Sequence, residues 1–198
     1  MNATILDYGA GNLHSLAKAL DGDGFSVRIT DDPIAALATD LLVLPGVGSF
    51  PYAAAALAPA RDEVRRAILG GLPTLGICLG MQLFFASSDE GVGRGLGVFD
   101  GRVVRLDAPR LPHIGWNSLD DVADDDLRSS GLASVYYANS FVCRPAESSD
   151  VRAWTTYDTA RFPAMIRRGR VAGMQFHPEK SSAAGVRALR AVARGLVA

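Results

Sequence analysis

The chain has 198 residues, of which 48% are hydrophobic and 21% are charged, and its formal net charge is −1 at pH 7. This composition is ordinary for a compact globular protein, and a chain of this length can bury about 70% of its unfolded surface in one core. We therefore expect a single domain over residues 1–198, and the near-zero charge argues against nucleic acid as a partner.

The start of the chain and its cysteines bear on location. Residues 1–7 contain no basic region followed by a long apolar segment, and no run of 18 apolar residues occurs in the sequence. We therefore expect a cytoplasmic protein without a membrane span. In a reducing compartment the two cysteines, Cys78 and Cys143, should stay free thiols.

The first part of the chain alternates strand and helix patterns. The apolar run Thr4–Leu6 predicts a buried strand that ends at a glycine-containing turn, Asp7–Asn12. Apolar residues then recur at helical spacing over Leu13–Leu20. Phe25–Ile29 predicts a half-exposed strand, and Asp31–Pro33 supplies an N-cap with proline at the first position of a helix.

A second set of alternating elements follows. The continuous apolar run Asp40–Leu44 is typical of a parallel strand covered on both faces, and it ends at the loop Pro45–Gly48. Arg61–Leu69 predicts a helix, Leu72–Ile77 returns the chain to the sheet, and a further helix is expected through Phe85. Repeated strand–helix units of this kind predict a parallel α/β sheet.

Beyond Ser88 the pattern changes to shorter β-like pieces, which we expect to extend the sheet with antiparallel members. They are Gly97–Phe99, Arg102–Val104, Ser134–Tyr137, Ala153–Thr155, Ala164–Ile166 and Val171–Gln175. The acidic run from Asp120 to Asp126 is interpreted as a solvated loop. Ser181–Val197 predicts a closing helix. The expected fold class is therefore α/β, with a mostly parallel central sheet and an antiparallel extension.

The segment Gly76-Ile77-Cys78-Leu79-Gly80 places a cysteine between two glycines just after a strand pattern. Glycines on either side of a nucleophile permit the sharp strand-to-helix turn that lifts a reactive atom above a sheet. The helix that follows would direct its unpaired amides at the sulfur. A lone cysteine is more often an inert buried side chain, but the flanking glycines favour Cys78 as a nucleophile.

A possible base and a carboxylate lie far downstream, in the segment Gln175–Lys180. Pro178 disfavours helical backbone at His177, so we expect this segment to be extended or in a turn. Residues two apart in an extended segment project to the same side, which would let Glu179 orient the imidazole for proton transfer with Cys78. The alternative is a strand-end histidine beside a surface glutamate.

The loop Pro45–Gly48 offers backbone donors for a tetrahedral oxyanion. The amides of Val47 and Gly48, together with that of Leu79 after the proposed nucleophile, would form the oxyanion hole. The alternative is an ordinary glycine turn, whereas a phosphate loop would need a Lys-Ser/Thr ending. No Cys-x-x-Cys or His-x-x-x-His spacing occurs, so we expect no metal and no cofactor.

Five motifs give the chain a resemblance to a known family. They are Asp7–Asn12, Pro45–Gly48, Gly76–Gln82, Pro112–Asn117 and Gln175–Ser181. Together they span nearly the whole chain and resemble the class I (triad) glutamine amidotransferases, in particular the glutaminase subunits of imidazole glycerol phosphate synthase from histidine biosynthesis. The resemblance implies the three-layer, flavodoxin-like α/β fold of that family.

The resemblance also implies a mechanism. Cys78 would attack the side-chain amide of L-glutamine, His177 would protonate the departing ammonia, and Glu179 would orient His177. Water would then release glutamate from the thioester. By the same similarity, the substrate would be held by Gly48, Gln82, Glu90, Asn139 and Ser140.

A partner is implied as well. Ammonia would pass to a (β/α)8-barrel cyclase subunit that forms imidazole glycerol phosphate and an aminoimidazole carboxamide ribotide, in a heterodimer. Asn12, Trp116 and Lys180 match positions at the docking surface of the family. One position departs from the family, because Asn139 stands where histidine usually precedes Ser or Thr. Since this position mainly offers backbone to the substrate, activity should survive.

Two other hypotheses remain open at this point. Glutaminase subunits for anthranilate, aminodeoxychorismate or pyridoxal phosphate synthesis share the triad but should lack the Trp116-Asn117 pair. A non-catalytic scaffold subunit would keep the fold and only bind partners, although the intact set of Cys78, His177 and Glu179 argues against it.

Overall fold

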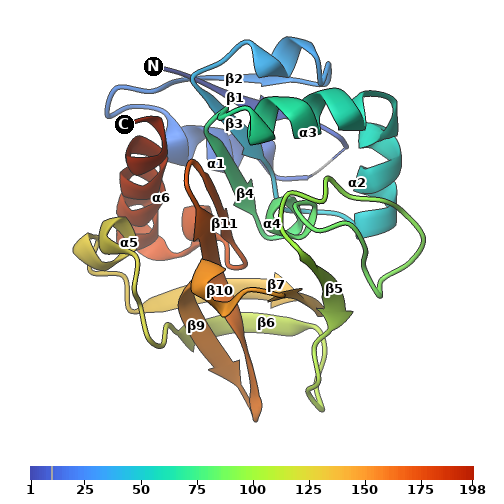
Figure 1. Cartoon of the computed structure of the whole chain (residues 1–198). Helices are drawn as coiled ribbons and strands as arrows, with labels where there is room; N and C mark the ends of the chain where they lie inside the picture. Colours follow the sequence, from blue (N-terminus) through green and yellow to red (C-terminus); the bar gives the residue numbers. More distant parts are fainter. Residues whose placement is uncertain (10) are drawn as a thin grey trace.

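The computed structural model describes residues 1–9 and 11–198, so Ala10 of the predicted turn Asp7–Asn12 lies outside the described residues. A seven-stranded sheet forms the centre of the molecule, in the order β2-β1-β3-β4-β11-β10-β9 (Figure 1). The strands from β2 to β11 run parallel, and β10 and β9 continue the sheet with antiparallel pairing. The predicted fold class is therefore confirmed.

The central strands are β1 (Asn2–Leu6), β2 (Ser26–Thr30), β3 (Leu41–Leu44), β4 (Thr74–Ile77), β9 (Val151–Tyr157), β10 (Ala160–Arg168) and β11 (Val171–Met174). Two smaller antiparallel sheets pair β5 (Gly101–Arg105) with β8 (Phe141–Pro145), and β6 (His113–Ser118) with β7 (Ser134–Asn139).

The α-helices are α1 (Leu13–Leu20), α2 (Phe50–Leu57), α3 (Arg61–Leu69), α4 (Leu79–Gln82), α5 (Asp125–Ser129) and α6 (Ser182–Val197). Single 3₁₀ turns are η1 (Ala35–Leu37), η2 (Ala58–Ala60), η3 (Ser148–Asp150) and η4 (Pro178–Lys180). None of the helices in the described part of the chain is both long enough and apolar enough to cross a membrane.

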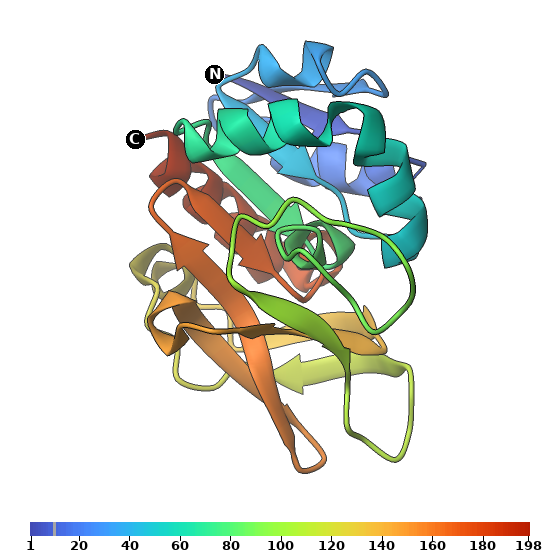
Figure 2. The same ribbon diagram turned by 45° about the vertical axis from the view of Figure 1, so that its right-hand side comes forward.

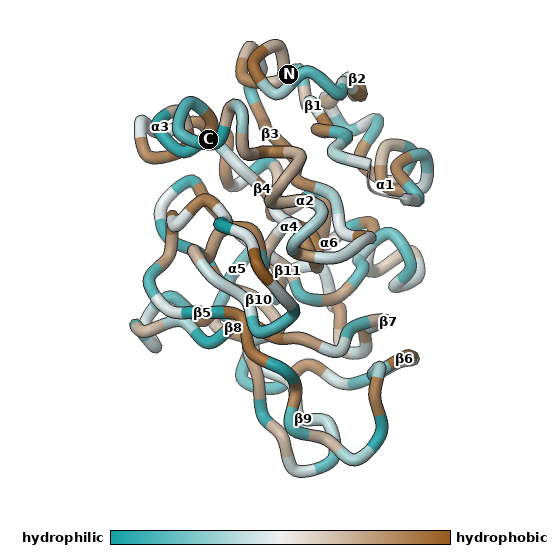
Figure 3. Tube along the Cα trace, turned by 90° about the vertical axis from the view of Figure 1, so that its right-hand side faces the viewer, coloured by the Kyte–Doolittle hydropathy of each residue, from teal (hydrophilic) through white to brown (hydrophobic). Residues whose placement is uncertain are grey.

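Side chains alternate between the two faces of the parallel strands, and each face carries its own apolar cluster. Ile5 belongs to the cluster that packs α1 and α6, whereas its neighbour Leu6 belongs to the cluster that packs α2 and α3. Helices thus cover both faces of the sheet, which gives three layers (Figure 2). All of β3 is buried, as expected for a parallel strand in this position, and β3 is strongly hydrophobic in Figure 3.

The β6–β7 sheet lies beyond the carboxyl ends of the parallel strands (Figure 1). The chain leaving β11 reaches β7, where the amide of His177 donates a hydrogen bond to the carbonyl of Tyr136, at 2.9 Å. The turn between β7 and β8 lies in the same region. In open α/β sheets, ligands bind outside the carboxyl ends of the strands. We therefore expect the site to lie here, between the ends of the parallel strands and β7.

Two predicted helices are shorter than expected. Asp32 accepts hydrogen bonds from the amides of Ile34 and Ala35, at 2.8 and 3.0 Å, but only the single 3₁₀ turn η1 follows, because the chain must enter β3 at Leu41. The helix expected through Phe85 ends at Gln82 and tightens into turns that bond three residues apart.

Several strand predictions also needed the tertiary structure. Gly97–Phe99 is not a strand, because the amides of Val98 and Phe99 both donate to the carbonyl of Phe84 instead of to a neighbouring strand. The sequence analysis did not predict α2, β6 or β8. The strand β8 is short and is defined by its pairing with β5. A pairing between distant segments cannot be read from the local sequence pattern.

The acidic run Asp120–Asp126 is not simply a solvated loop. Asp124 is buried and caps α5 by accepting a hydrogen bond from the amide of Leu127, at 2.9 Å. The guanidinium of Arg167 lies 3.0 Å from Asp124 and 2.8 Å from Asp126. The earlier interpretation was wrong for these two residues because the cation that neutralises them comes from β10, far along the chain.

Candidate active site

Cys78 forms the turn between β4 and α4. Its backbone has φ 48° and ψ −101°, a region that residues other than glycine rarely adopt. A Cβ atom at Gly76 would lie 2.6 Å from the backbone of Gly80, and one at Gly80 would overlap the carbonyl oxygen of Leu44 in β3. Close backbone approach therefore requires both glycines, and the predicted strained elbow is confirmed.

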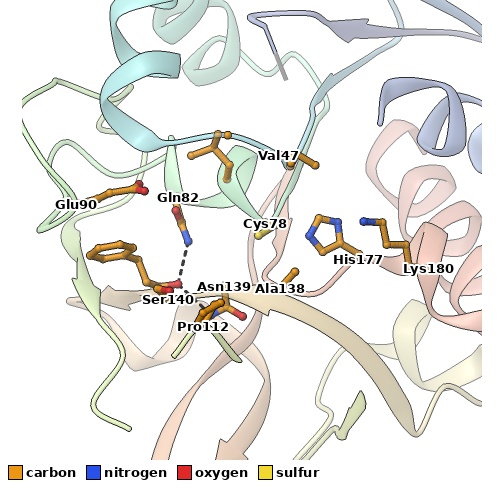
Figure 4. Close-up of a pocket in the computed structure, with 14 residues that line it drawn as sticks. Val47, Cys78, Gln82, Glu90, Pro112, Ala138, Asn139, Ser140, His177 and Lys180 are labelled. Atoms are coloured by element: carbon orange, nitrogen blue, oxygen red, sulfur yellow. Dashed lines mark hydrogen bonds between the residues drawn. The ribbon is translucent and has the colours of Figure 1, made fainter. Parts of the chain in front are cut away.

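His177 and Glu179 lie at the carboxyl end of β11, and both side chains are buried. Nδ1 of His177 is 2.9 Å from Oε1 of Glu179, which leaves Nε2 for the sulfur of Cys78. Figure 4 shows the side chains of Cys78 and His177 next to each other at the pocket. His177 itself is extended, as predicted, but Glu179 belongs to the 3₁₀ turn η4. Its carboxylate thus reaches the imidazole because the chain folds back after Pro178, and not through an extended segment.

The charges around His177 set its protonation state. Burial by itself lowers the pKa of His177, because a charged ring is poorly solvated inside the protein. The interactions of His177 with Cys78 and with the Glu179 carboxylate outweigh burial and raise the pKa of His177 to about 10. An imidazolium is therefore favoured at neutral pH, and such a ring both stabilises a neighbouring thiolate and has a proton to give.

A pocket of about 260 Å³ opens in front of Cys78 and His177 (Figure 4). Its lining consists of Gly46, Val47, Gly48, Cys78, Leu79, Gln82, Glu90, Pro112, Ala138, Asn139, Ser140, Phe141, His177 and Lys180. Every residue predicted to hold glutamine or an oxyanion is in this set. Pro112, Ala138 and Phe141 were not predicted to belong to the site. The volume is just below the range of drug-sized ligand sites, about 300–1,000 Å³, and suits a single amino acid.

Two polar side chains in the pocket are already held by backbone partners. The amide nitrogen of Gln82 donates to the carbonyl of Phe141, at 3.0 Å. The carboxylate of Glu90 accepts from the amide of Phe50, the first residue of α2, at 2.7 Å. These bonds fix the direction of both side chains, which favours binding because little rotamer freedom remains to be lost.

The predicted oxyanion donors lie on two different elements. Val47 and Gly48 are exposed on the loop after β3, and Leu79 is the first residue of α4. The amide of a first helical residue has no partner within its helix, so Leu79 can donate outward. Both elements line the pocket next to Cys78.

Tyr8 supports the loop after β3, and the sequence analysis did not assign it a role. It is buried, and its hydroxyl donates a hydrogen bond to the carbonyl oxygen of Pro45. Burial, followed by the nearby charges of Cys78 and Asp7, raises the pKa of Tyr8 well above its ordinary value. Tyr8 therefore stays a neutral donor. Only its place at the end of β1 could have indicated this role.

The residues predicted to meet a partner are all exposed. Trp116 is 55% exposed on β6, and its ring meets the edge of Tyr136 with centroids 6.3 Å apart. Nζ of Lys180 lies 5.9 Å from the centroid of the Tyr136 ring. Ile114, which is on β6 like Trp116, is 63% exposed. Asn12 is the N-cap of α1, which contacts η4. We call Asn12, Ile114, Trp116, Tyr136 and Lys180 the rim surface. The name reflects its position at the edge of the pocket, which Lys180 also lines.

Asn139, the position that departs from the family pattern, is buried at the pocket. Its amide nitrogen donates to the carbonyl of Phe141, at 3.1 Å, and its Oδ1 has no hydrogen-bond partner among the described residues. Asn139 pairs across the β6–β7 ladder with His113. That ring is buried and stacks on Tyr137 and Tyr157, with centroids 4.9 and 3.9 Å away, and burial lowers the pKa of His113.

Within residues 1–9 and 11–198, no group of three or more His, Cys, Asp or Glu side chains is arranged to hold a metal ion. Both cysteines are free thiols, and Cys143 is buried away from the pocket lining.

Comparison with known proteins identifies the family. The family model for class-I glutamine amidotransferases matches residues 4–191. A relative from Symbiobacterium thermophilum, imidazole glycerol phosphate synthase subunit HisH, is 45% identical over 192 residues, which cover 93% of this chain and 90% of the relative. The HisH subunit of Sulfolobus acidocaldarius is 40% identical over 201 residues and 99% of both chains.

A solved crystal structure of a glutamine amidotransferase superimposes with a TM-score of 0.75 at 21% identity, covering 98% of both chains, which supports the fold. The chain therefore belongs to the class-I glutamine amidotransferases and, within them, to the HisH subunits of imidazole glycerol phosphate synthase. This membership confirms the resemblance drawn from the five sequence motifs.

Proposed function

We propose that the pocket hydrolyses L-glutamine to glutamate and ammonia through a thioester on Cys78, as the ammonia source of an imidazole glycerol phosphate synthase in histidine biosynthesis. One observation carries the proposal. The elbow cysteine and the imidazole of His177 line one pocket, and the carboxylate of Glu179 contacts that imidazole, with Oε1 2.9 Å from Nδ1 of His177. A nucleophile, a base and an orienting carboxylate in this relation suit acyl transfer.

The first half of the reaction forms the thioester. The Cys78 thiolate attacks the side-chain carbonyl carbon of glutamine, and the resulting oxyanion accepts hydrogen bonds from the amides of Leu79 and the Val47-Gly48 loop. His177 gives its proton to the amide nitrogen, the carbon–nitrogen bond breaks, and ammonia leaves. Glu179 keeps Nδ1 protonated so that Nε2 faces the reacting atoms.

The second half releases glutamate. The now neutral His177 takes a proton from water, whose oxygen attacks the thioester carbon. The carbon–sulfur bond breaks, and glutamate leaves. The thiolate and the imidazolium are restored together, so no external acid is consumed.

The substrate head group fits the polar side of the pocket. The glutamine α-ammonium needs oxygen acceptors, which the Gln82 carbonyl and the Glu90 carboxylate supply. The α-carboxylate needs donors, which the backbone of Gly48 and the Asn139-Ser140 turn supply. The side-chain amide then points toward Cys78.

The ammonia acceptor is the second part of the proposal. Relatives of the chain are named as subunits of imidazole glycerol phosphate synthase. We therefore propose a heterodimer with a (β/α)8-barrel cyclase, which docks on the rim surface. Exposed aromatic and aliphatic side chains with one cation are typical of interface anchors, and Lys180 at the pocket edge would lie close to the path of ammonia.

The decisive experiment labels the nucleophile. The protein, mixed with its barrel partner and the partner's ligand, is treated with a glutamine-analogue electrophile, and labelled peptides are mapped by mass spectrometry. We expect one label, at Cys78, and glutamate release that is weak without the partner. Cys78→Ala should abolish both, whereas Cys143→Ala should keep both because Cys143 lies outside the pocket.

A non-catalytic scaffold predicts another result. In that case the complex would still assemble, but neither Cys78 labelling nor glutamate release would occur in the presence of the partner. Glutamate release by Cys78→Ala at the native rate would refute Cys78 as the nucleophile, although the proposal that the protein hydrolyses glutamine would still hold.

A further inference from the structure

We infer that Gln175 is a positioning residue that ties the nucleophile to the amide that receives the substrate; the inference rests on the proposed function. Gln175 is fully buried, and its side chain uses both ends. Its Nε2 donates to Sγ of Cys78, at 3.5 Å, and its Oε1 accepts from Nε2 of Gln82, at 3.4 Å. No other side chain among the described residues is hydrogen-bonded to both groups.

The fold places Gln175 beside the elbow through strand pairing. β11 lies next to β4, with Met174 opposite Ile77, and the amide of Cys78 donates to the carbonyl of Met174, at 2.6 Å. Gln175 directly follows the last residue of β11 and is therefore at the level of the nucleophile. Its own amide donates to the carbonyl of Ala164 in β10, at 2.9 Å, which fixes the backbone from the other side.

The first consequence concerns the direction of the Gln82 amide. A primary amide has two N–H donors on one end and a carbonyl acceptor on the other. Both donors of Gln82 have partners, the carbonyl of Phe141 at 3.0 Å and Oε1 of Gln175 at 3.4 Å. The reversed amide would set its oxygen against two other oxygens. Gln175 thus turns the Gln82 carbonyl toward the pocket, where an α-ammonium needs an acceptor.

The second consequence concerns the sulfur. An N–H donor next to a thiolate forms a charge-assisted hydrogen bond, which is stronger than a bond between neutral groups. The bond from Gln175 therefore stabilises the ionised sulfur and restricts its rotation. A glutamine that merely filled the core would affect folding stability but neither of these properties.

The test uses Gln175→Met, which keeps the length of the side chain without its polar atoms. In the complex with the barrel partner, we expect the KM for glutamine to rise about tenfold. The variant loses the hydrogen bond that orients the Gln82 carbonyl, which is the proposed acceptor for the α-ammonium group. We also expect iodoacetamide to alkylate Cys78 about tenfold more slowly at pH 7, measured on the full chain by peptide mass spectrometry.

A double-mutant cycle separates positioning from packing. Gln82→Met should raise KM without slowing alkylation, because Gln82 has no bond to the sulfur. The double variant should show little further rise in KM over Gln82→Met, because Gln175 acts on the substrate through Gln82. Thr74→Val serves as the control, since it removes a buried hydroxyl at the opposite end of β4 and should change neither readout.

Gln175→Glu covers the case in which Gln175→Met fails to fold. It keeps an oxygen toward Gln82 but removes the N–H toward the sulfur, so KM should stay within about threefold while alkylation slows at least tenfold. Native KM and native alkylation in a folded Gln175 variant would overturn the inference, and so would additive effects on KM in the cycle. A wild-type complex that neither labels at Cys78 nor releases glutamate would instead refute the proposed function.

Discussion

The amide of His177 and the carbonyl of Tyr136 are joined by a hydrogen bond of 2.9 Å, which attaches the proposed general acid to β7. Ser181 adds two more bonds, since its hydroxyl accepts from the amide of Tyr136 at 2.9 Å and donates to the carbonyl of His177 at 2.6 Å. The ring of Tyr136 meanwhile contacts Trp116 and Lys180 on the rim surface. One residue of β7 thus touches both the catalytic segment and the predicted docking surface.

Removing the aromatic anchor of the rim surface should weaken partner binding. Trp116→Ala is expected to lower affinity for the barrel partner about 30-fold, the size of a typical interface hot spot, by isothermal titration calorimetry. Labelling of Cys78 in the separated subunit should not change. Leu69→Ala is the control. Leu69 is 53% exposed at the end of α3, just before the start of β4, whereas the site lies at the carboxyl ends of the strands. Its replacement should therefore leave affinity intact. Equal affinities for all three proteins would place the interface elsewhere.

Glu179→Gln should impair the reaction and not the fold. The amide cannot hold Nδ1 of His177 in the same charged contact, so the proton is less well placed for the leaving ammonia. We expect kcat for glutamate release in the complex to fall at least about 100-fold, within the usual range for general acid–base catalysis. Glu147→Gln, on the exposed surface, should keep the native kcat, and a comparable kcat for Glu179→Gln would contradict the orienting role.

The raised pKa of His177 predicts a pH window for stability. The folded-state pKa is about 10, against about 6.5 for an unperturbed histidine, so the native state binds more protons than the unfolded state between these values. This contribution to the free energy of unfolding is complete below about pH 6.5 and is lost as pH rises through about 10. Urea unfolding across pH 6–11 should show this decline in the wild type and a smaller one in His177→Gln.

NMR of the three histidine side chains checks the same assignment directly. One imidazole should titrate near pH 10 and move to lower pH in both Cys78→Ala and Glu179→Gln, because each variant removes a negative charge that raises the pKa of His177. A second, His113, should titrate below the ordinary histidine value because burial lowers its pKa. If no signal titrates above pH 8, the thiolate–imidazolium pair is absent.

Gly80→Ala should destabilise the elbow. The added methyl group would overlap the backbone of Leu44, which cannot move without disturbing β3. We expect a loss of about 3 kcal/mol, at the upper end of overpacking effects, and a thermal midpoint about 6–12 °C lower. Gly11→Ala is the matched control, since its methyl group would meet Val47 at an ordinary 3.9 Å. Equal midpoints for the two variants would show that the close approach at Gly80 is not rigid.

The expectation of one domain over residues 1–198 stays a prediction, and so do the individual roles assigned to the site residues. Several features nevertheless support one unit. The first described strand, β1, and the last, β11, share a sheet, and α1 near the start of the chain packs against α6 near its end. A single cooperative unfolding transition would be the direct check.

The sequence by itself determined the parallel strands and the elbow, because both depend on local patterns. The continuous apolar run Asp40–Leu44 is typical of a strand covered on both faces, and the glycines at 76 and 80 are recognisable without knowledge of what they touch. The helix α2 was missed although Ser49 and Pro51 provide a start pattern for it. The start of α2 is therefore encoded locally, in the residues around Ser49.

Only the tertiary structure decided which distant groups meet. Buried Asp124 acquired a partner from β10, His177 acquired its backbone support from β7, and the pocket drew its lining from six separate segments. Strand order and register fix these contacts, and they depend on packing summed over the whole chain. A short window of sequence contains the residues that react, but the distances between them are set by the sheet that the complete chain forms.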